Sequence, residues 1–333
     1  MIRTTSLLSA LIFLCFFWAR RAHAQSEQAY DSLVTQAFKL YESKEYKASA
    51  EKFAEAFVVL GAKSYMEDRY NAACSWALAG GTDAAFNQLF KITQSGQYTN
   101  LEHISSDPDL HSLHQDKRWK KIIQQVTKNK EKEEAHYDKT LVAMLDSVYR
   151  EDQGHRIRIN EIQEKYGWKS PQMDSIWKVI GVADSINLIK IKHLIDTRGW
   201  LGADVVGRNG NSTIFLVIQH ADQKTQEQYL PVMRDAVAKG NALPANLALL
   251  EDRVALGQGK KQIYGSQIGM FAETGESYVL PLEDPDNVEK RRAAVGLNKL
   301  ADYVKYWGLT WNVEEYKLNL PRYEEQQKKF HRD

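Results

Sequence analysis

The sequence predicts a mainly α-helical protein, in which helical hairpins precede a C-terminal helical domain that carries one small β-hairpin. Apolar residues recur at helical spacing in two successive segments before residue 100. The same spacing continues over longer stretches after residue 138. Between residues 257 and 282 the pattern changes to short runs rich in β-branched and aromatic residues, which is typical of strands.

Residues 1–24 have the features of a secretory signal peptide. Arg3 precedes an apolar stretch over residues 7–18, and small residues in the segment 22–24 form a cleavage site of the A-x-A kind. We therefore expect an exported protein, periplasmic or secreted, that begins at Gln25. Because Arg20 lies unusually between the apolar stretch and this site, a retained anchor is the alternative.

The composition sets limits on what the exported protein does. Its 333 residues, 43% of them hydrophobic, suggest two globular domains. With 44 basic and 43 acidic residues, the near-neutral charge gives no support for a nucleic-acid partner. After the signal no stretch approaches about 18 consecutive apolar residues, so we expect no membrane span. Cys15 lacks the small neighbours of a lipidation site, and a single cysteine, Cys74, remains, which excludes an intramolecular disulfide.

The first domain, residues 25–127, reads as helical hairpins. Residues 30–60 form one hairpin interrupted at 43–45, with Ala37 and Ala50 small enough to let its helices approach closely. In the next unit, residues 63–96, the first helix is predicted to end at Gly80-Gly81, and Thr82 is the predicted N-cap of the returning helix.

Two stretches, residues 68–92 and 105–123, resemble the closing unit of tetratricopeptide arrays, whose repeat is about 34 residues. In this resemblance the segment Asp107-Pro108-Asp109-Leu110 leads into a capping helix that ends near Ile123. The resemblance covers about a hundred residues and implies a groove for a protein or peptide. Generic helical hairpins are the alternative.

The segment KNKEKEE, residues 128–134, has no apolar residue, and we place a connector between the domains at residues 128–137. Lysine and glutamate also favour helix, so a flexible linker and an exposed helix both remain open.

The C-terminal domain, residues 138–333, is predicted to be helical on either side of a hairpin. Pro171 after Ser170 starts a long helix, and Gly199 ends it. Asp286 with Glu289 forms a capping box for a late helix. The remaining expected elements are a helix over 141–165, a glycine loop over 202–210, helices over 213–219, 224–238 and 244–256, a hairpin of 262–271 with 276–282 turning at Gly275, and a last helix to about Trp307 before a frayed end.

A set of polar motifs in this domain resembles an uncharacterised bacterial family known only as a domain of unknown function. The ordered set spans about 150 residues, and Ser266 stands where the family usually has threonine. The resemblance implies a shared fold and no particular activity. The motifs are Asp152-Gln153 with Arg156, Gly199-Trp200, Val206-Gly207, QHAD at 219–222, LEDRV at 250–254, QIYGSQ at 262–267, and EDPDNVEKRRAAVGL at 283–297.

Three of these residues are candidate catalytic acids or bases. His220 and Asp222 end an apolar helix, where a carboxylate can orient an imidazole for proton transfer. The alternative is an imidazolium that stabilises the helix C-terminus. Asp252 and Arg253 point about 100° apart on one helix and so do not pair with each other. A structural salt bridge to another element is the commoner explanation for such a residue.

The candidate ligand-binding residues are polar side chains of the same motifs. Gln262, Tyr264 and Ser266 would share one face of the predicted strand, which suits a sugar or peptide. A hydrogen-bonded hairpin that caps the helices is the alternative. We expect the segments around His220, Asp252 and Tyr264 to converge, because unpaired buried polar groups are costly. The full candidate set is Asp152, Arg156, Arg253, Gln262, Tyr264 and Gln267.

Familiar cofactor and metal motifs are missing from the sequence: there is no HExxH pair, no P-loop and no G-x-S-x-G elbow. We therefore expect no metal and no cofactor. The leading interpretation is an envelope protein that binds a protein or peptide through its tetratricopeptide-like hairpins. The alternative is a hydrolase or lyase that acts on an envelope glycan or peptide through the polar cluster.

Overall fold

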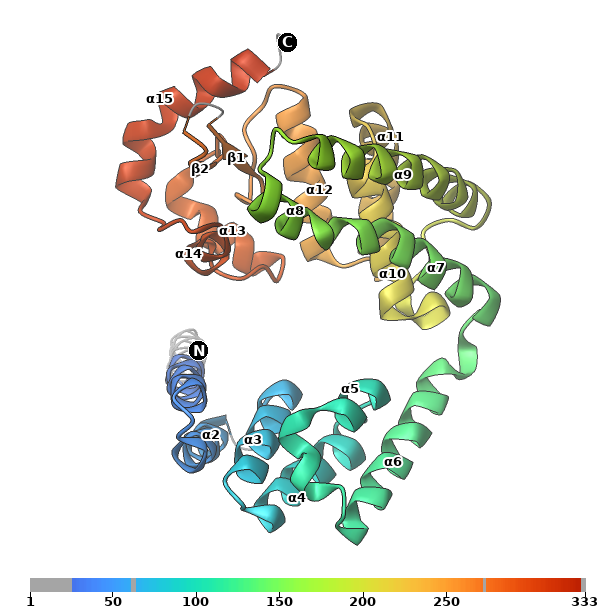
Figure 1. Cartoon of the computed structure of the whole chain (residues 1–333), viewed down its shortest axis with the longest axis vertical. Helices are drawn as coiled ribbons and strands as arrows, with labels where there is room; N and C mark the ends of the chain where they lie inside the picture. The colour runs from blue at the N-terminus through green and yellow to red at the C-terminus, as the bar shows by residue number, and fades with distance from the viewer. Residues whose placement is uncertain (1–25, 61–63, 272–273, 331–333) are drawn as a thin grey trace, which may run out of the picture. The chain divides into compact units, whose positions relative to one another are not determined.

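The computed structural model describes residues 26–60, 64–271 and 274–330. The chain divides into two compact units, residues 1–135 and 136–333 (Figure 1). The described residues are mainly helical and contain one two-stranded antiparallel sheet, which confirms the predicted fold class. The predicted signal, residues 1–24, lies outside the described residues. Among the helices described, none is long and apolar enough to cross a membrane.

The first hairpin pairs a helix over residues 26–42 with α2, Tyr46–Leu60. Lys44 turns the chain between them with a φ of 62°. Ala37 and Ala50 are both fully buried where the two helices meet, as their size predicts. Their small side chains let the helices approach while the ring of Phe53 fills the adjacent core.

The second hairpin consists of α3, Met66–Leu78, and α4, Thr82–Phe90. The prediction that Thr82 caps α4 is wrong, because Gly81 occupies the N-cap position and no side chain caps the helix. A Cβ at Gly81 would lie 2.6 Å from the Trp76 ring, so close packing selects glycine there.

The first unit ends in a long amphipathic helix. After a π-helical turn at Lys91–Ser95 come α5, Leu101–Ser106, the 3-10 helix Pro108–Leu113 and α6, Lys117–Glu133. Helix α6 continues well beyond the predicted end at Ile123, so residues 128–133 of the charged segment are helical. A 3-10 turn, Glu134–His136, follows it.

Six α-helices precede the two-stranded sheet in the described part of the second unit. The helices are α7 Lys139–Arg156, α8 Arg158–Tyr166, α9 Pro171–Arg198, α10 Ala203–His220, α11 Gln223–Ala238 and α12 Pro244–Gly257. Five of them, α7 and α9 to α12, meet around Leu145, Ile191, Ile214, Met233 and Leu250. Helix α8 packs against the first half of α9 in a separate apolar cluster.

The limits of α9 follow from local chemistry, as predicted. The Ser170 hydroxyl accepts a hydrogen bond from the N–H of Met173 at 3.2 Å, and Pro171 occupies the first turn. Gly199 ends the helix with a φ of 74°. These two signals need no tertiary contact, which explains why the sequence predicts both ends of the helix.

The predicted glycine loop over residues 202–210 is instead the first part of α10. Gly207 kinks the helix with a φ of 71°, and a Cβ there would lie 3.1 Å from the Tyr137 ring. A Cβ on Gly210 would lie 3.0 Å from the Leu145 side chain. These glycines therefore serve close packing of α10 against its neighbours, and the helix begins at Ala203.

The hairpin is shorter than predicted. Strands β1, Ile268–Met270, and β2, Ser277–Val279, pair antiparallel with Gly269 opposite Tyr278. Gly275 has a φ of 74° near the turn, although residues 272–273 of the predicted connection lie outside the described residues. Residues 262–267 form a loop instead of a strand, with a single bridge from Gln262 to Leu282.

The chain ends in short helices and one long helix. The predicted capping box is wrong: Asn287 stands at the N-cap of α13, and the Glu289 carboxylate accepts from the N–H of Leu300 at 3.0 Å. The sequence predicts no helix after Trp307, whereas α15 continues to Phe330 and is held by the buried Tyr316, whose hydroxyl donates to the Leu280 carbonyl at 2.9 Å. Residues 331–333 of the predicted frayed end lie outside the described residues. The elements are a 3-10 turn Pro285–Asn287, α13 Val288–Ala294, α14 Leu300–Tyr303, a 3-10 turn Val304–Trp307 and α15 Val313–Phe330.

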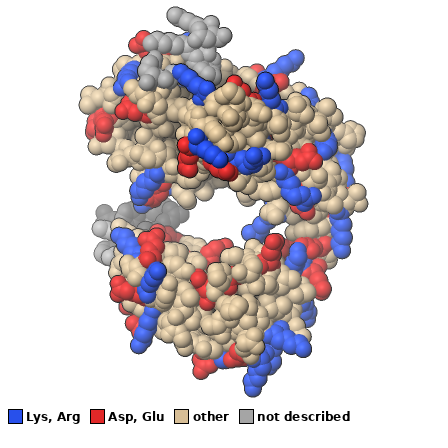
Figure 2. Space-filling view, in the orientation of Figure 1, with Lys and Arg blue, Asp and Glu red and all other residues tan. Residues whose placement is uncertain are grey.

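Basic and acidic side chains are interspersed among uncharged residues over the visible face (Figure 2). The polar groups considered below are therefore distinguished by their burial and their partners, and not by charge alone.

Candidate functional site

Four charged or titratable side chains from three helices of the second unit form one network, which we call the His220 cluster. Helix α7 supplies Asp152 and Arg156, α9 supplies Asp184, and α10 ends at His220. Asp152 and Arg156 share a face of α7 because they are four residues apart. The last residue of α10 is thereby brought against the C-terminal turns of α7.

A buried carboxylate holds the imidazole. Nδ1 of His220 lies 3.0 Å from Oδ1 of Asp152, and Nε2 of Gln153 donates to Oδ2 of Asp152 at 2.6 Å. Burial raises the pKa of Asp152, but the hydrogen bond and charge of His220 and the charge of Arg156 together outweigh it and lower the pKa. Asp152 is therefore an ionised acceptor, and the proton lies on Nδ1 of the imidazole.

The other nitrogen of the ring is available. Nε2 of His220 forms no hydrogen bond with any described residue, and the side chain keeps 19% of its surface exposed, whereas Asp152 keeps 1%. An oriented imidazole with one nitrogen bound to a carboxylate and the other open is the arrangement that general acid–base catalysis uses.

Arg156 is fully engaged inside the cluster. Its two terminal nitrogens donate to the Asp184 carboxylate at 2.9 and 2.8 Å, which is a bidentate pair. One of them also donates to the Asp152 carbonyl at 2.7 Å and lies 3.3 Å from Oδ1 of Asp152. Arg156 therefore neutralises part of the charge of two carboxylates.

Arg253 on α12 has no such partner. Its Nε is buried without a hydrogen-bond partner, and the guanidinium forms no ion pair with any described residue. Burial lowers the pKa of Arg253; the charge of Tyr303 opposes that shift and the positive charge of Arg156 adds to it. Arg253 is thus close enough to the His220 cluster to feel the charge of Arg156.

Asp252, a predicted acid or base, binds backbone N–H groups of a loop. The carboxylate is fully buried and accepts from the N–H groups of Ile263 at 2.6 Å, Tyr264 at 2.9 Å and Ser266 at 2.9 Å. Burial raises the pKa of Asp252, although these three hydrogen bonds oppose the rise. Asp252 therefore anchors the loop over residues 262–267 to α12.

The two glutamines of this loop, Gln262 and Gln267, also form hydrogen bonds with each other and with neighbouring groups. Nε2 of Gln262 donates to the carbonyls of Gln267 at 3.0 Å and Leu280 at 2.8 Å, and its Oε1 accepts from the N–H of Gln267 at 2.9 Å. Nε2 of Gln267 donates to the Ser266 hydroxyl at 3.0 Å. The row of free donors predicted on a strand is therefore a closed loop network.

Two arginines that the sequence interpretation did not select complete the loop. Arg292 is almost fully buried and donates to the carbonyls of Tyr264 at 2.7 Å and Asn298 at 2.6 Å. Arg291 donates to the Ile263 carbonyl at 2.8 Å. Both lie in the motif at residues 283–297. The motif could have pointed to these two arginines, but it does not indicate that they bind the loop.

The predicted residues thus fall into separate groups. His220, Asp152 and Arg156 come together, whereas Asp222 caps α11 by accepting from the N–H of Thr225 at 2.7 Å, a bond that lowers its pKa. The predicted convergence of three segments is only partial, because Asp252 joins the N–H of Tyr264 while His220 joins Asp152. The Tyr264 hydroxyl itself lies 3.5 Å from Glu251. Asp184, which the sequence interpretation missed, is a carboxylate within the apolar pattern of α9.

Two groups of described side chains have the spacing of metal ligands. In the first, the ligand atoms of Asp152, Asp184 and His220 lie within 4.8 Å of one another. The guanidinium of Arg156 already lies between the two carboxylates and supplies positive charge there. This donor set therefore does not fit a metal ion.

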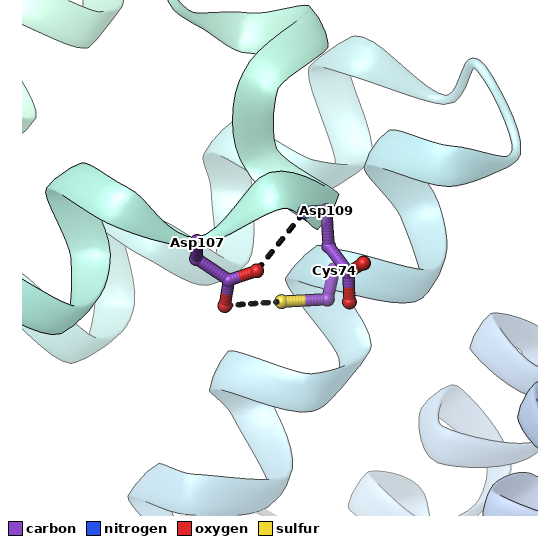
Figure 3. Close-up of side chains that lie close together, drawn as sticks. All are labelled: Cys74, Asp107 and Asp109. Atoms are coloured by element: carbon purple, nitrogen blue, oxygen red, sulfur yellow. Dashed lines mark hydrogen bonds between the residues drawn. The ribbon is translucent and has the colours of Figure 1, made fainter.

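The second group lies in the first unit, where Cys74 of α3 meets Asp107 and Asp109 (Figure 3). Sγ of Cys74 lies 3.7 Å from Oδ2 of Asp107, whose other oxygen accepts from the N–H of Asp109 at 3.0 Å. Tyr70 donates to Asp107 at 2.8 Å, and Tyr41 donates to Asp109. Burial and the nearby carboxylates raise the pKa of the Cys74 thiol, which keeps it protonated and unreactive.

Comparison with known proteins identifies the second unit. Residues 137–314, just over half of the chain, match a family of unknown function, DUF6624. The match covers the His220 cluster, Arg253 and the loop that Asp252 anchors. No curated protein and no solved structure matches the chain.

Proposed function

The chain belongs to DUF6624, a family of unknown function, and we propose that its C-terminal unit is a hydrolase or lyase in which His220 acts as general acid or base. One observation carries the proposal. A buried carboxylate, Asp152, binds Nδ1 of His220 at 3.0 Å and leaves Nε2 without a partner among the described residues. Asp152 orients the ring and stabilises the imidazolium that forms when Nε2 takes a proton.

The surroundings of the imidazole support this role. Arg156 and Asp184 form a bidentate pair, and Arg156 also donates to the Asp152 carbonyl, so the backbone of α7 at Asp152 is joined to α9. A catalytic group held by packing and by second hydrogen bonds loses little entropy when it reacts. We propose an envelope glycan or peptide as the substrate class, in line with the expected signal at residues 1–24.

Turnover of isolated envelope material tests the catalytic role. Purified protein is incubated with peptidoglycan and envelope peptides, and released products are followed by mass spectrometry. We expect His220→Gln to abolish a product that the wild type forms, and the matched change His193→Gln, at an exposed histidine of α9, to leave it unchanged. Equal product from His220→Gln and wild type would reject the proposal.

Export is the second part of the proposal and rests on residues 1–24 alone. Fractionation of the producing cells, followed by N-terminal sequencing, tests it. A chain in the periplasm or medium that begins at Gln25 supports it, and a cytoplasmic chain that begins at Met1 rejects it.

We also propose that the N-terminal hairpins bind a protein or peptide. Large apolar side chains on the first unit are exposed: Val58 keeps 82% of its surface, Tyr65 53% and Phe38 40%. Exposed apolar groups on helical hairpins commonly mark an interaction surface. In pull-downs from envelope extract with the full chain, Val58→Asp should lose a partner that the exposed control Glu51→Gln retains. Retention of every partner by Val58→Asp would contradict the proposal.

A further inference from the structure

Arg253 stands apart from the other buried arginines of the second unit. Arg156 pairs with Asp184, and Arg292 donates to two backbone carbonyls. Arg253 has a buried Nε and no hydrogen bond or ion pair with any described residue. A buried N–H without an acceptor, such as that of Nε in Arg253, is destabilising, because the water that solvated it is not replaced.

The acidic neighbours of Arg253 on its own helix are already committed. Asp252 accepts from three backbone N–H groups of the loop it anchors. The Glu251 carboxylate accepts from Arg234 at 2.8 Å. Successive helical positions point about 100° apart, so neither carboxylate reaches the guanidinium of Arg253. Its side chain is nevertheless only partly buried.

We infer that Arg253 binds the anionic group of the substrate and that this group is a carboxylate. The inference rests on the proposed function, since the anion is taken to be part of the substrate on which His220 acts. The observation behind it is the buried Nε of Arg253, which has no hydrogen-bond partner among the described residues. The guanidinium offers a planar pair of donors that matches the two oxygens of a carboxylate. The bound anion supplies hydrogen-bond acceptors and a negative charge, neither of which the described residues provide to Arg253.

The charge count selects a singly charged group over a dianion. Within the His220 cluster the carboxylates of Asp152 and Asp184 face the single guanidinium of Arg156, so that cluster has no positive charge to spare. Arg253 contributes one positive charge, so the charges of Asp152, Asp184, Arg156 and Arg253 sum to zero with a neutral imidazole. A carboxylate then adds one negative charge and a phosphate dianion adds two, so the carboxylate is repelled less by the two carboxylates.

Binding of small carboxylates to the full chain tests the inference without a known substrate. The probe is N-acetylglycine, compared with neutral N-acetylglycinamide, inorganic phosphate and sodium chloride at equal ionic strength. Isothermal titration and the melting temperature are measured for wild type, Arg253→Gln, Arg253→Lys and Arg150→Gln, an exposed arginine on α7 that serves as the control.

We expect N-acetylglycine to raise the melting temperature of the wild type and of Arg150→Gln in a saturable way. Arg253→Gln should weaken its binding at least about tenfold, the effect of losing one charge-assisted pair, and Arg253→Lys should be intermediate. Without ligand, Arg253→Gln should melt at or above the wild-type temperature, because it removes a partly buried charge that has no partner among the described residues.

Three results would overturn the inference: no response to N-acetylglycine beyond that to the amide, tighter binding of phosphate, or a lower melting temperature of unliganded Arg253→Gln. His220→Gln separates this inference from the proposed function. If that variant binds N-acetylglycine as the wild type does but keeps turnover, the catalytic role of His220 fails while the anion site stands. If turnover depends on His220 and no carboxylate binds, the anion site fails alone.

Discussion

Asp152 and His220 lie 68 positions apart in the chain and meet at 3.0 Å, with the carboxylate buried and the far nitrogen of the imidazole open. The pairing ties the end of α10 to the face of α7 and sets which nitrogen of the ring carries the proton. Both the catalytic proposal and its tests depend on this contact.

Replacement of Asp152 by asparagine should lower activity far more than stability. The amide can donate to Nδ1 and so favour the wrong tautomer, and it no longer stabilises an imidazolium. We expect turnover to fall by at least about a hundredfold. The variant loses both the correct tautomer and the stabilising charge, and general acid–base catalysis contributes a factor of this size. Turnover of Asp152→Asn close to that of wild type would contradict this role, and circular dichroism of the variant checks that the fold is retained.

The dependence of the unfolding free energy on pH should show the contribution of ionised Asp152. Its pKa in the folded protein is lower than the ordinary value of 3.8, so its contribution is complete above that value and is lost as the pH falls through the folded pKa. Urea denaturation between pH 6 and about 3 should therefore show a steeper loss of unfolding free energy for wild type than for Asp152→Asn. Parallel curves would show that Asp152 does not contribute in this way.

Asp252→Asn should destabilise the second unit without acting on chemistry. An asparagine retains one acceptor oxygen but turns an NH₂ group toward N–H groups that the carboxylate had satisfied. We expect a loss of about 1–3 kcal/mol of unfolding free energy. The matched control is Asp222→Asn, because asparagine caps a helix about as well as aspartate. An unchanged unfolding free energy in Asp252→Asn would show that the loop does not depend on the charge.

The hydroxyl of Tyr264 should matter little for folding. The loop network uses its backbone N–H, whereas the hydroxyl lies 3.5 Å from Glu251, a distance at the limit of a hydrogen bond. Tyr264→Phe should therefore change the unfolding free energy by less than about 1 kcal/mol. A larger loss in urea denaturation would mean that the hydroxyl contact is stronger than its length indicates.

The thiol of Cys74 provides a probe of the first unit. It is buried and its pKa is raised, so a thiol reagent should label it only when the unit opens. Tyr41 joins the first helix to Asp109, beside the same thiol. Tyr41→Phe should therefore increase the labelling rate in native buffer, whereas Tyr149→Phe, an exposed tyrosine of the other unit, should not. Rapid labelling of the wild type would contradict the buried, protonated thiol.

The sequence predicts those elements whose limits are set locally. Ser170 and Gly199 mark the ends of α9 through a cap and a left-handed residue, and both signals act within one helical turn. By contrast, Gly207 and Gly210 suggest a loop from the sequence, because only the neighbouring Tyr137 and Leu145 reveal that the glycines permit close packing within a helix.

The sequence predicts part of the candidate site but not its arrangement. His220, Asp152 and Arg156 stand out as polar residues in motifs, but their pairing depends on the packing of α10 against α7 and α9. The sequence predicts a strand at residues 262–267 from alternation and composition. In the structure the backbone donors of this segment meet the carboxylate of Asp252 and not a neighbouring strand. The spacing of polar and apolar residues gives no information on which acceptor the backbone N–H groups of this segment bind.

The tautomer of His220 tests the central claim most directly and needs no substrate. Long-range ¹H–¹⁵N correlation spectra of the histidine rings, with His220 assigned by the loss of its signals in His220→Gln, are recorded at a pH where the ring is neutral. We predict that the proton lies on Nδ1 in wild type and that Asp152→Asn alters this preference. A wild-type ring protonated on Nε2, or one that Asp152→Asn leaves unchanged, would contradict the account.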